Sequence, residues 1–129
     1  MKKLLPPVFF LLLFAACEKD YHYIQKPVEI DPGFQISFTQ EIAPIFANHG
    51  CAVANCHSTG ANSPDLTPGS AYANLSGYIS KEKAESSRIY VVLTDKNDPY
   101  YMGTKGSSPV TAEETAKLLQ WIKQGAKNN

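Results

Sequence analysis

Two thiols and an imidazole stand close together near the middle of the chain, and they constrain its fold more than any other feature. Cys51 and Cys56 are separated by four residues, and His57 directly follows the second cysteine. Side chains of these types in this order attach a haem through thioether bonds and offer the histidine to its iron. The usual spacing between such cysteines is two residues. Residues 52–55 are therefore expected to bulge or coil.

The same side chains allow two other arrangements. In an oxidising compartment Cys51 and Cys56 can form a disulfide that closes a short loop and leaves His57 on the surface. That alternative predicts an exported protein without haem that acts as a binding module. Zinc bound by these residues and His49 is possible by residue type. It is disfavoured, because adjacent Cys56 and His57 do not easily point at one tetrahedral ion.

The first 16 residues have the features of an export signal. Lys2 and Lys3 precede an apolar run that ends at Ala16 and is interrupted by two prolines. A membrane-spanning helix needs roughly 20 apolar residues, and this run is shorter. Residues 1–16 are therefore predicted to be a signal peptide.

Residues 14–17, with the sequence FAAC, resemble the signal of bacterial lipoproteins, in which the cysteine is lipid-modified and begins the mature protein. Three cysteines in an exported protein would leave one thiol unpaired. Lipidation of Cys17 removes this difficulty, because Cys51 and Cys56 then remain as a pair. The resemblance implies a protein anchored to a membrane by acyl chains, on the periplasmic or cell-surface side.

A tether and one small domain are predicted for the rest of the chain. Residues 17–36 carry scattered charges and prolines without a sustained hydrophobic period, as expected of a tether. Residues 37–127 form the predicted folded unit, whose size limits its core and favours a cofactor or a covalent staple. The chain has 12 basic and 12 acidic side chains, so it offers no support for nucleic-acid binding, which requires a basic face.

A helix is expected at the start of this domain. Ser37 or Thr39 is the candidate cap of a helix that runs toward residues 48–50. Pro44 lacks a backbone donor, so the helix should kink there or have its regular part begin near Glu41.

The last helix has the clearest signals. Thr111 and Glu114 have the spacing of a capping box, and Gly125 is placed to end the helix. Between the two ends, residues 70–75 are a candidate short helix. Residues 86–94 are ambiguous, because their β-branched side chains favour a strand while their apolar spacing suits one face of a helix.

A haem iron would need a second axial ligand opposite His57. That ligand must come from far along the chain, since the backbone has to pass around the porphyrin edge. Met1 leaves with the signal, so a thioether ligand would be Met102, which lies in a glycine-rich segment. His49, His22 or water remains the alternative, although His49 lies too close before the cysteine pair to reach the far face easily.

These features follow one another in an order that resembles the class I monohaem cytochrome c domain. The matching sequences are IAPIF at 42–46, the cysteine pair with its histidine, DL at 65–66, Met102, and WIKQGA at 121–126. The similarity covers about residues 37–126. It implies an all-α fold in which the N- and C-terminal helices cross beside a covalently bound haem, with Phe46 against Trp121.

The resemblance also implies the roles of the site residues. Cys51 and Cys56 would attach one haem c, and His57 and Met102 would be its axial ligands. The implied function is electron transfer to and from redox protein partners, without catalysis. A haem enzyme or sensor with an open sixth position is the alternative if Met102 is not a ligand.

Supporting contacts can be expected around such a site. A metal-bound imidazole usually donates its other nitrogen to a carbonyl, and that of Pro64 or a neighbour is the candidate. Arg88, the only arginine, would pair with a haem propionate or remain exposed to solvent. The tyrosines are expected by default to pack in the core.

Overall fold

The computed structural model describes residues 28–129. The predicted signal peptide, the candidate lipidation site Cys17 and the first part of the predicted tether lie outside the described residues. The described part is a small all-α domain, as predicted, with four α-helices, three shorter helical segments and no β-strand. The elements are η1 (Phe38–Ile42), α1 (Ala43–Asn48), α2 (Ala71–Leu75), η2 (Ser76–Tyr78), η3 (Ala84–Ser86), α3 (Arg88–Thr94) and α4 (Ala112–Lys123).

The first helical segment is irregular just before Pro44. Ser37 caps it, since its hydroxyl oxygen accepts a hydrogen bond from the Gln40 N–H at 3.3 Å. The turn η1 is π-helical, and the Ala43 N–H donates to the Phe38 carbonyl. Regular α-helix begins at Ala43, so Pro44 lies in the first turn of α1. At that position proline removes no hydrogen bond from the helix.

The ambiguous segment 86–94 contains helix α3. Ile89 and Leu93 lie four residues apart and are both buried. Helix α3 packs against α4. Contact with a distant helix therefore overrides the strand preference of the β-branched residues. Helix α2 forms where it was expected, but the Ser70 side chain makes no capping hydrogen bond.

Both ends of α4 have the hydrogen bonds that its sequence predicts. The Thr111 hydroxyl accepts from the Glu114 N–H at 3.2 Å, and the Glu114 carboxylate accepts from the Thr111 N–H at 2.8 Å. Gly125, at φ +96°, follows the other end. The N–H groups of Gly125 and its successor donate to the carbonyls of Ile122 and Trp121, which is the Schellman pattern.

Trp121 lies at the centre of an aromatic cluster in the core. Its ring centroid is 5.3 Å from that of Phe38 and 6.4 Å from that of Tyr72, and its indole N–H donates to the Lys127 carbonyl. The first and last helical segments thus pack together, with η1 as the part that contacts α4. Phe46, expected beside Trp121, is buried in the same core but takes part in none of the ring pairs found in residues 28–129.

The C-terminal residues return to the start of the domain. Ser37 donates to the Asn129 carbonyl at 2.7 Å. The Gln124 side-chain amide accepts from the Ile36 N–H and donates to the Phe34 carbonyl. Ile36 is only 2% exposed. The core therefore includes a residue from the segment predicted to be a tether.

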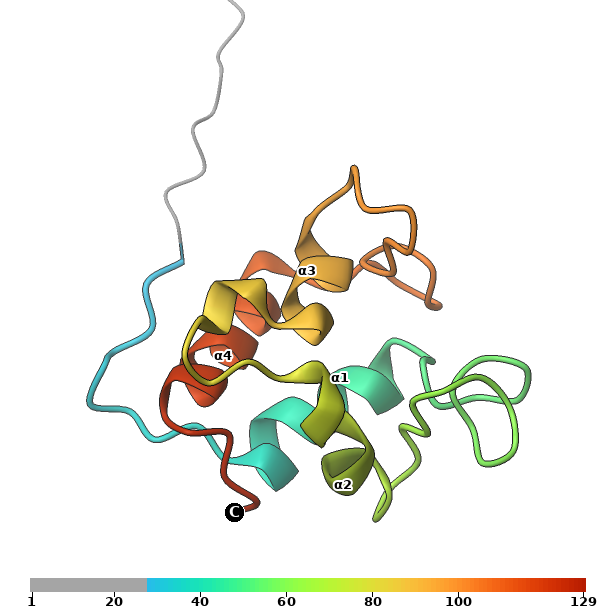
Figure 1. Ribbon diagram of the computed structural model, residues 1–129, viewed down its shortest axis with the longest axis horizontal. Coiled ribbons are helices and arrows are strands. Elements are labelled where there is room, and N and C mark those ends of the chain that lie inside the picture. The colour runs from blue at the N-terminus through green and yellow to red at the C-terminus, as the bar shows by residue number, and fades with distance from the viewer. Residues whose placement is uncertain (1–27) are drawn as a thin grey trace, which may run out of the picture.

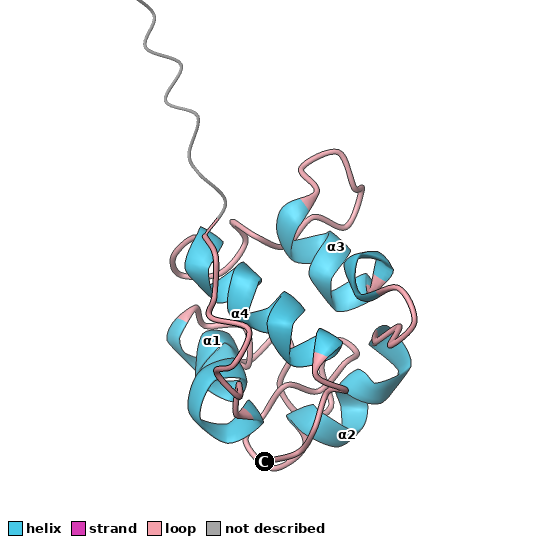
Figure 2. Cartoon of the chain, turned by 90° about the vertical axis from the view of Figure 1, so that its left-hand side faces the viewer, coloured by secondary structure: helices cyan, strands magenta, loops and turns pink. Residues whose placement is uncertain are grey.

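Two long segments without α-helix extend from the helices on the same side of the molecule. We call residues 49–70, after α1, the histidine loop, and residues 95–111, after α3, the methionine loop. Figure 1 shows them at the right, in green and orange, with α4 at the left of α1 and α3. Figure 2, turned by 90°, shows α4 between these two helices. Within residues 28–129, no helix has the length and apolar character needed to cross a membrane.

Candidate cofactor site

A cavity of about 310 Å³ lies among α1, α3 and the two loops. Cofactor and small-molecule sites typically have volumes of roughly 300–1,000 Å³ and mostly apolar walls. Three of the four residues predicted to hold a haem line this cavity, namely Cys51, His57 and Met102. Most of its apolar wall is contributed by Phe46 of α1, by Pro64 and Leu66 of the histidine loop, and by Ile89, Val92 and Leu93 of α3.

His57 is oriented by carbonyl groups of its own loop. Its Nδ1 lies 3.0 Å from the Pro64 carbonyl oxygen and 3.3 Å from that of Asn62. Carbonyl oxygens only accept hydrogen bonds, so Nδ1 carries the proton, and Nε2 of the neutral ring keeps its lone pair. This is the tautomer that metal coordination through Nε2 requires. The hydrogen bond expected between His57 and Pro64 is confirmed.

The four residues between the cysteines form turns. The Cys56 N–H donates to the Val53 carbonyl at 3.1 Å, and the His57 N–H donates to the Cys51 carbonyl at 2.9 Å. Asn55 adopts the left-handed conformation at φ +67°, which asparagine tolerates better than most residues. The two extra residues of the motif are thus absorbed locally, and His57 stays next to Cys51.

The two thiols have different surroundings. Cys51 is half-buried and lines the cavity, and its burial, followed by the nearby Cys56, raises the pKa of its thiol. Cys56 is exposed and does not contribute to the cavity lining. Both cysteines are free thiols in this structure.

Met102 reaches the cavity from the methionine loop. Its N–H donates to the Val92 carbonyl of α3 at 2.6 Å, and the residue is 39% exposed. A Cβ atom added at Gly103 would overlap the carbonyl oxygen of Leu93, so glycine permits this close approach of the loop to α3. Met102 and His57 therefore line one cavity from two different loops.

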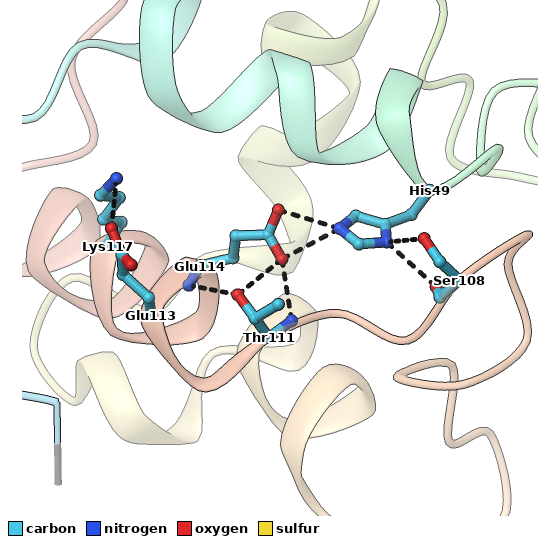
Figure 3. A network of polar contacts seen from close by, with 6 residues as sticks. All are labelled: His49, Ser108, Thr111, Glu113, Glu114 and Lys117. Carbon is cyan, nitrogen blue, oxygen red and sulfur yellow. Dashed lines mark hydrogen bonds and ion pairs between the residues drawn. The ribbon is translucent and has the colours of Figure 1, made fainter.

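His49 lies away from the cavity and is occupied by other partners. Its ring nitrogens bond to Ser108 and Glu114 (Figure 3). It is therefore not available as the axial ligand or as a zinc ligand beside the cysteines. Among residues 28–129, no group of three or more His, Cys, Asp or Glu side chains is placed to hold a metal ion. His22, the other histidine considered as a ligand, lies outside the described residues.

Arg88 lines the cavity and is paired with a carboxylate of the methionine loop. Its Nη2 donates to the Asp98 Oδ1 at 3.0 Å, and its guanidinium lies 5.3 Å from the centre of the Tyr100 ring. The hydrogen bond between them raises the pKa of Arg88 and lowers that of Asp98. Arg88 was expected to pair with a haem propionate or to remain exposed to solvent. Its pairing with Asp98 is neither of these.

Two further polar contacts near the site join partners that the sequence did not indicate, although Tyr78 was one of the tyrosines considered for the pocket lining. Tyr78 lines the cavity and lies within hydrogen-bond distance of the Ser63 hydroxyl, at 3.2 Å. The network around His49 was also missed, because only the capping role of Glu114 is visible from local spacing. A histidine two residues before the cysteine motif, at the end of an apolar helix, is the one sequence signal that could have pointed to a buried polar contact there.

No family model, curated protein or solved structure matches this chain. A functional conclusion therefore depends on the geometry of the cavity and on the chemistry of the side chains that line it.

Proposed function

We propose that this chain is an electron-transfer cytochrome of the c type, with one covalent haem in the cavity and a lipid anchor at Cys17. One observation carries the proposal. Cys51 and His57 of one short motif and Met102 from far along the chain line the same mostly apolar cavity. A thiol, an imidazole with a free lone pair and a thioether are the donors that covalent attachment and histidine–methionine ligation require.

The other residues of the cavity suit the same group. The aliphatic and aromatic walls would suit the apolar face of a porphyrin, and Arg88, although paired with Asp98, also lines the cavity and would be the cation available to a propionate. The haem supplies a one-electron couple between ferrous and ferric iron when it is bound. The contact of η1 with α4 supports a cytochrome c-like arrangement of the first and last helical segments.

The proposed role of the protein is to set the reduction potential and to keep other ligands from the iron. Methionine as a ligand raises the potential, and apolar walls that exclude water act in the same direction. The exposed edge of the site would face a redox protein partner, and Tyr100, 64% exposed, lies at that edge of the cavity. No substrate bond is made or broken, so we do not propose an enzyme.

A second candidate function follows from the exposure of Met102. A loop residue that is 39% exposed is less firmly held than His57, whose ring is oriented by two carbonyls. If Met102 does not bind the iron, the protein would be a haem enzyme or a sensor with an open sixth position. The weak ferric absorption band at the red end of the visible spectrum, which reports methionine sulfur on iron, separates the two candidates.

A pyridine haemochrome assay tests the main proposal. The full chain would be produced with a c-type maturation system, together with the variants Cys51→Ala and Cys56→Ala. We expect the wild-type spectrum to report haem attached through thioethers, and each variant to reveal whether its cysteine contributes one bond. Matured protein without Soret absorption, or a disulfide between Cys51 and Cys56 found by mass spectrometry, would refute the proposal and favour a binding module.

The anchor is tested separately. Cys17→Ser should release the protein from the membrane fraction into the soluble exported fraction without changing its haem content. Retention of this variant in the membrane fraction would contradict lipidation at Cys17.

A further inference from the structure

The methionine loop is held at its C-terminal half by His49. The Ser107 N–H donates to the His49 carbonyl at 2.8 Å. The His49 Nδ1 lies 3.0 Å from the Ser108 carbonyl oxygen and 2.8 Å from the Ser108 hydroxyl. Both the backbone and the side chain of one residue thus bind consecutive residues of the loop.

Two glycines allow the backbones to meet at this point. A Cβ atom added at Gly106 would overlap the His49 carbonyl oxygen. A Cβ atom at Gly50, which has φ +68°, would lie 3.2 Å from the Ser107 hydroxyl. The contact between the end of α1 and the methionine loop is therefore close, and larger side chains would not permit it.

The other side of the His49 ring is bound to the start of α4. The Nε2 atom lies 2.9 Å from each oxygen of the Glu114 carboxylate. The same carboxylate accepts hydrogen bonds from the N–H and hydroxyl of Thr111, each at 2.8 Å. Figure 3 shows the His49 ring between Glu114 on one side and Ser108 on the other.

The partners of the ring indicate its charge. Carboxylate oxygens face Nε2, and a carbonyl oxygen faces Nδ1, so a ring that donates from both nitrogens satisfies all of them. The side chain is only 8% exposed, and a buried charge of this kind needs its partner. His49 therefore connects the end of α1, the methionine loop and the first turn of α4 in one charged network.

This network joins the two walls of the cavity. Cys51 follows His49 by two residues, and Met102 lies in the loop that the His49 ring binds. We propose that His49 is a positioning residue, which fixes the methionine loop against α1 and α4 and thereby sets the position of Met102 relative to His57. The role of Met102 as a ligand rests on the proposed function, whereas the attachment of the loop does not.

Amide hydrogen exchange and visible spectra of the full, matured chain test this inference. His49→Ala removes the ring, and Glu114→Gln removes its charged partner while keeping a residue that serves in a capping box. Tyr72→Phe is the matched control, because it removes a single hydrogen bond, to the Ala126 carbonyl, outside the cavity lining. The test compares exchange at residues 102–108 and the red-end ferric band among these variants.

We expect His49→Ala to accelerate exchange at residues 102–108 by about tenfold, since the loop loses its anchor. The ferric methionine band should weaken and the reduction potential should fall, while the haem content stays unchanged. Glu114→Gln should shift the same readouts in the same direction by a smaller amount, and Tyr72→Phe should leave them as in the wild type.

The inference is wrong if exchange at residues 102–108 and the ferric band in both network variants match those of Tyr72→Phe. If His49→Ala does not fold, Glu114→Gln decides the question alone. A wild-type protein without haem would refute the proposed function, and the exchange comparison would then decide the role of His49 by itself.

Discussion

The histidine loop and the methionine loop line the same cavity, but they are held in place in different ways. Most of the hydrogen bonds of the histidine loop near the site join residues within it, from His57 to Cys51, from Asn62 to Cys56 and from Leu66 to His57. The methionine loop also has internal hydrogen bonds, such as those from Tyr101 to Asp98 and from Val110 to Gly103, but it is held in addition by a distant residue, because His49 at the end of α1 binds Ser107 and Ser108. Contacts at short sequence separation form at little entropic cost, whereas distant ones require the helices to be packed first.

The difference bears on how the proposed ligands behave. His57 is oriented by carbonyls that lie five and seven residues away in its own loop. Met102 depends on contacts from α1, α3 and α4, so changes far from the cavity should reach it. A loop supported in this way opens locally at lower free energy than a self-contained one. We therefore expect the position of His57 to be insensitive to changes elsewhere in the domain and the position of Met102 to respond to them.

Replacing the two proposed ligands should give the largest contrast. His57→Ala should lower the haem content after maturation by about tenfold or more, because the ligand beside the attachment cysteines is lost. Met102→Ala should retain the haem and lose only the red-end ferric band, with a lower reduction potential. Absorbance spectra and redox titration measure both effects. Equal loss of haem in the two variants would show that the loops do not differ as described.

Adding a methyl group to a glycine in each loop should distinguish local from long-range support. Gly106→Ala places its Cβ on the His49 carbonyl oxygen, and we expect a loss of about 3 kcal/mol in the free energy of unfolding. Gly60→Ala, at φ +79° with no heavy atom within 4 Å of the added Cβ, should cost only about 1 kcal/mol from backbone strain. Urea unfolding of both variants provides the comparison. A greater loss for Gly60→Ala would reverse the expected order.

The network that holds the methionine loop should respond to pH. The hydrogen bond to Glu114 raises the pKa of His49. Burial alone would raise the pKa of Glu114, but the hydrogen bonds from Thr111 and His49 outweigh it and lower this pKa. The contribution of His49 is complete below its usual pKa of about 6.5 and is lost as pH rises through the raised value. That of Glu114 is complete above about pH 4.3 and is lost as pH falls through the lowered value.

The stability that His49 adds should therefore be greatest between these limits. We expect the wild type to exceed His49→Gln by about 1–2 kcal/mol in the free energy of unfolding near pH 5.5, and by less as the pH rises. Urea unfolding of both proteins over a pH series measures this difference. A difference that stays constant up to alkaline pH would show that the charge on His49 does not contribute.

The smallest effect is expected inside the histidine loop. Asp65 accepts hydrogen bonds from the side chain and N–H of Thr67 and from the Thr59 hydroxyl, and these lower its pKa. Thr59→Ala removes the weakest of these contributions, so the pKa of Asp65 should rise slightly toward its usual value. NMR titration of Asp65 measures the shift. An altered ferric methionine band in this variant would indicate coupling between the loops that the hydrogen bonds do not suggest.

Features with short-range causes could be predicted from the chain alone. The capping box of Thr111 and Glu114, the glycine end of α4 and the hydrogen bond between His57 and Pro64 each join residues no more than seven positions apart. The turn between Cys51 and His57 belongs to the same class. Such contacts depend on local backbone geometry and side-chain chemistry, which spacing in the sequence records.

Features with distant partners could not be predicted in the same way. One such feature is the helical form of α3, which depends on packing against α4. Two others are the contact of Trp121 with Phe38 and the charged contact of His49 with Glu114, which join residues far apart in the sequence. Glu114 shows the limit well, because its local role was evident from the capping pattern while its second partner lies 65 residues away. The residues near Glu114 in the sequence do not indicate which distant side chain will contact its carboxylate.

The sequence by itself thus determined the ends of the last helix and the local geometry around His57, because these follow from interactions within a few residues, whereas the all-α class was expected only from the resemblance to a known family. Only the tertiary structure decided that Cys51 and Met102 line one cavity while Cys56 stands outside its lining, and that His49 supports the methionine loop. Those outcomes depend on how the helices pack, and packing is a property of the whole domain.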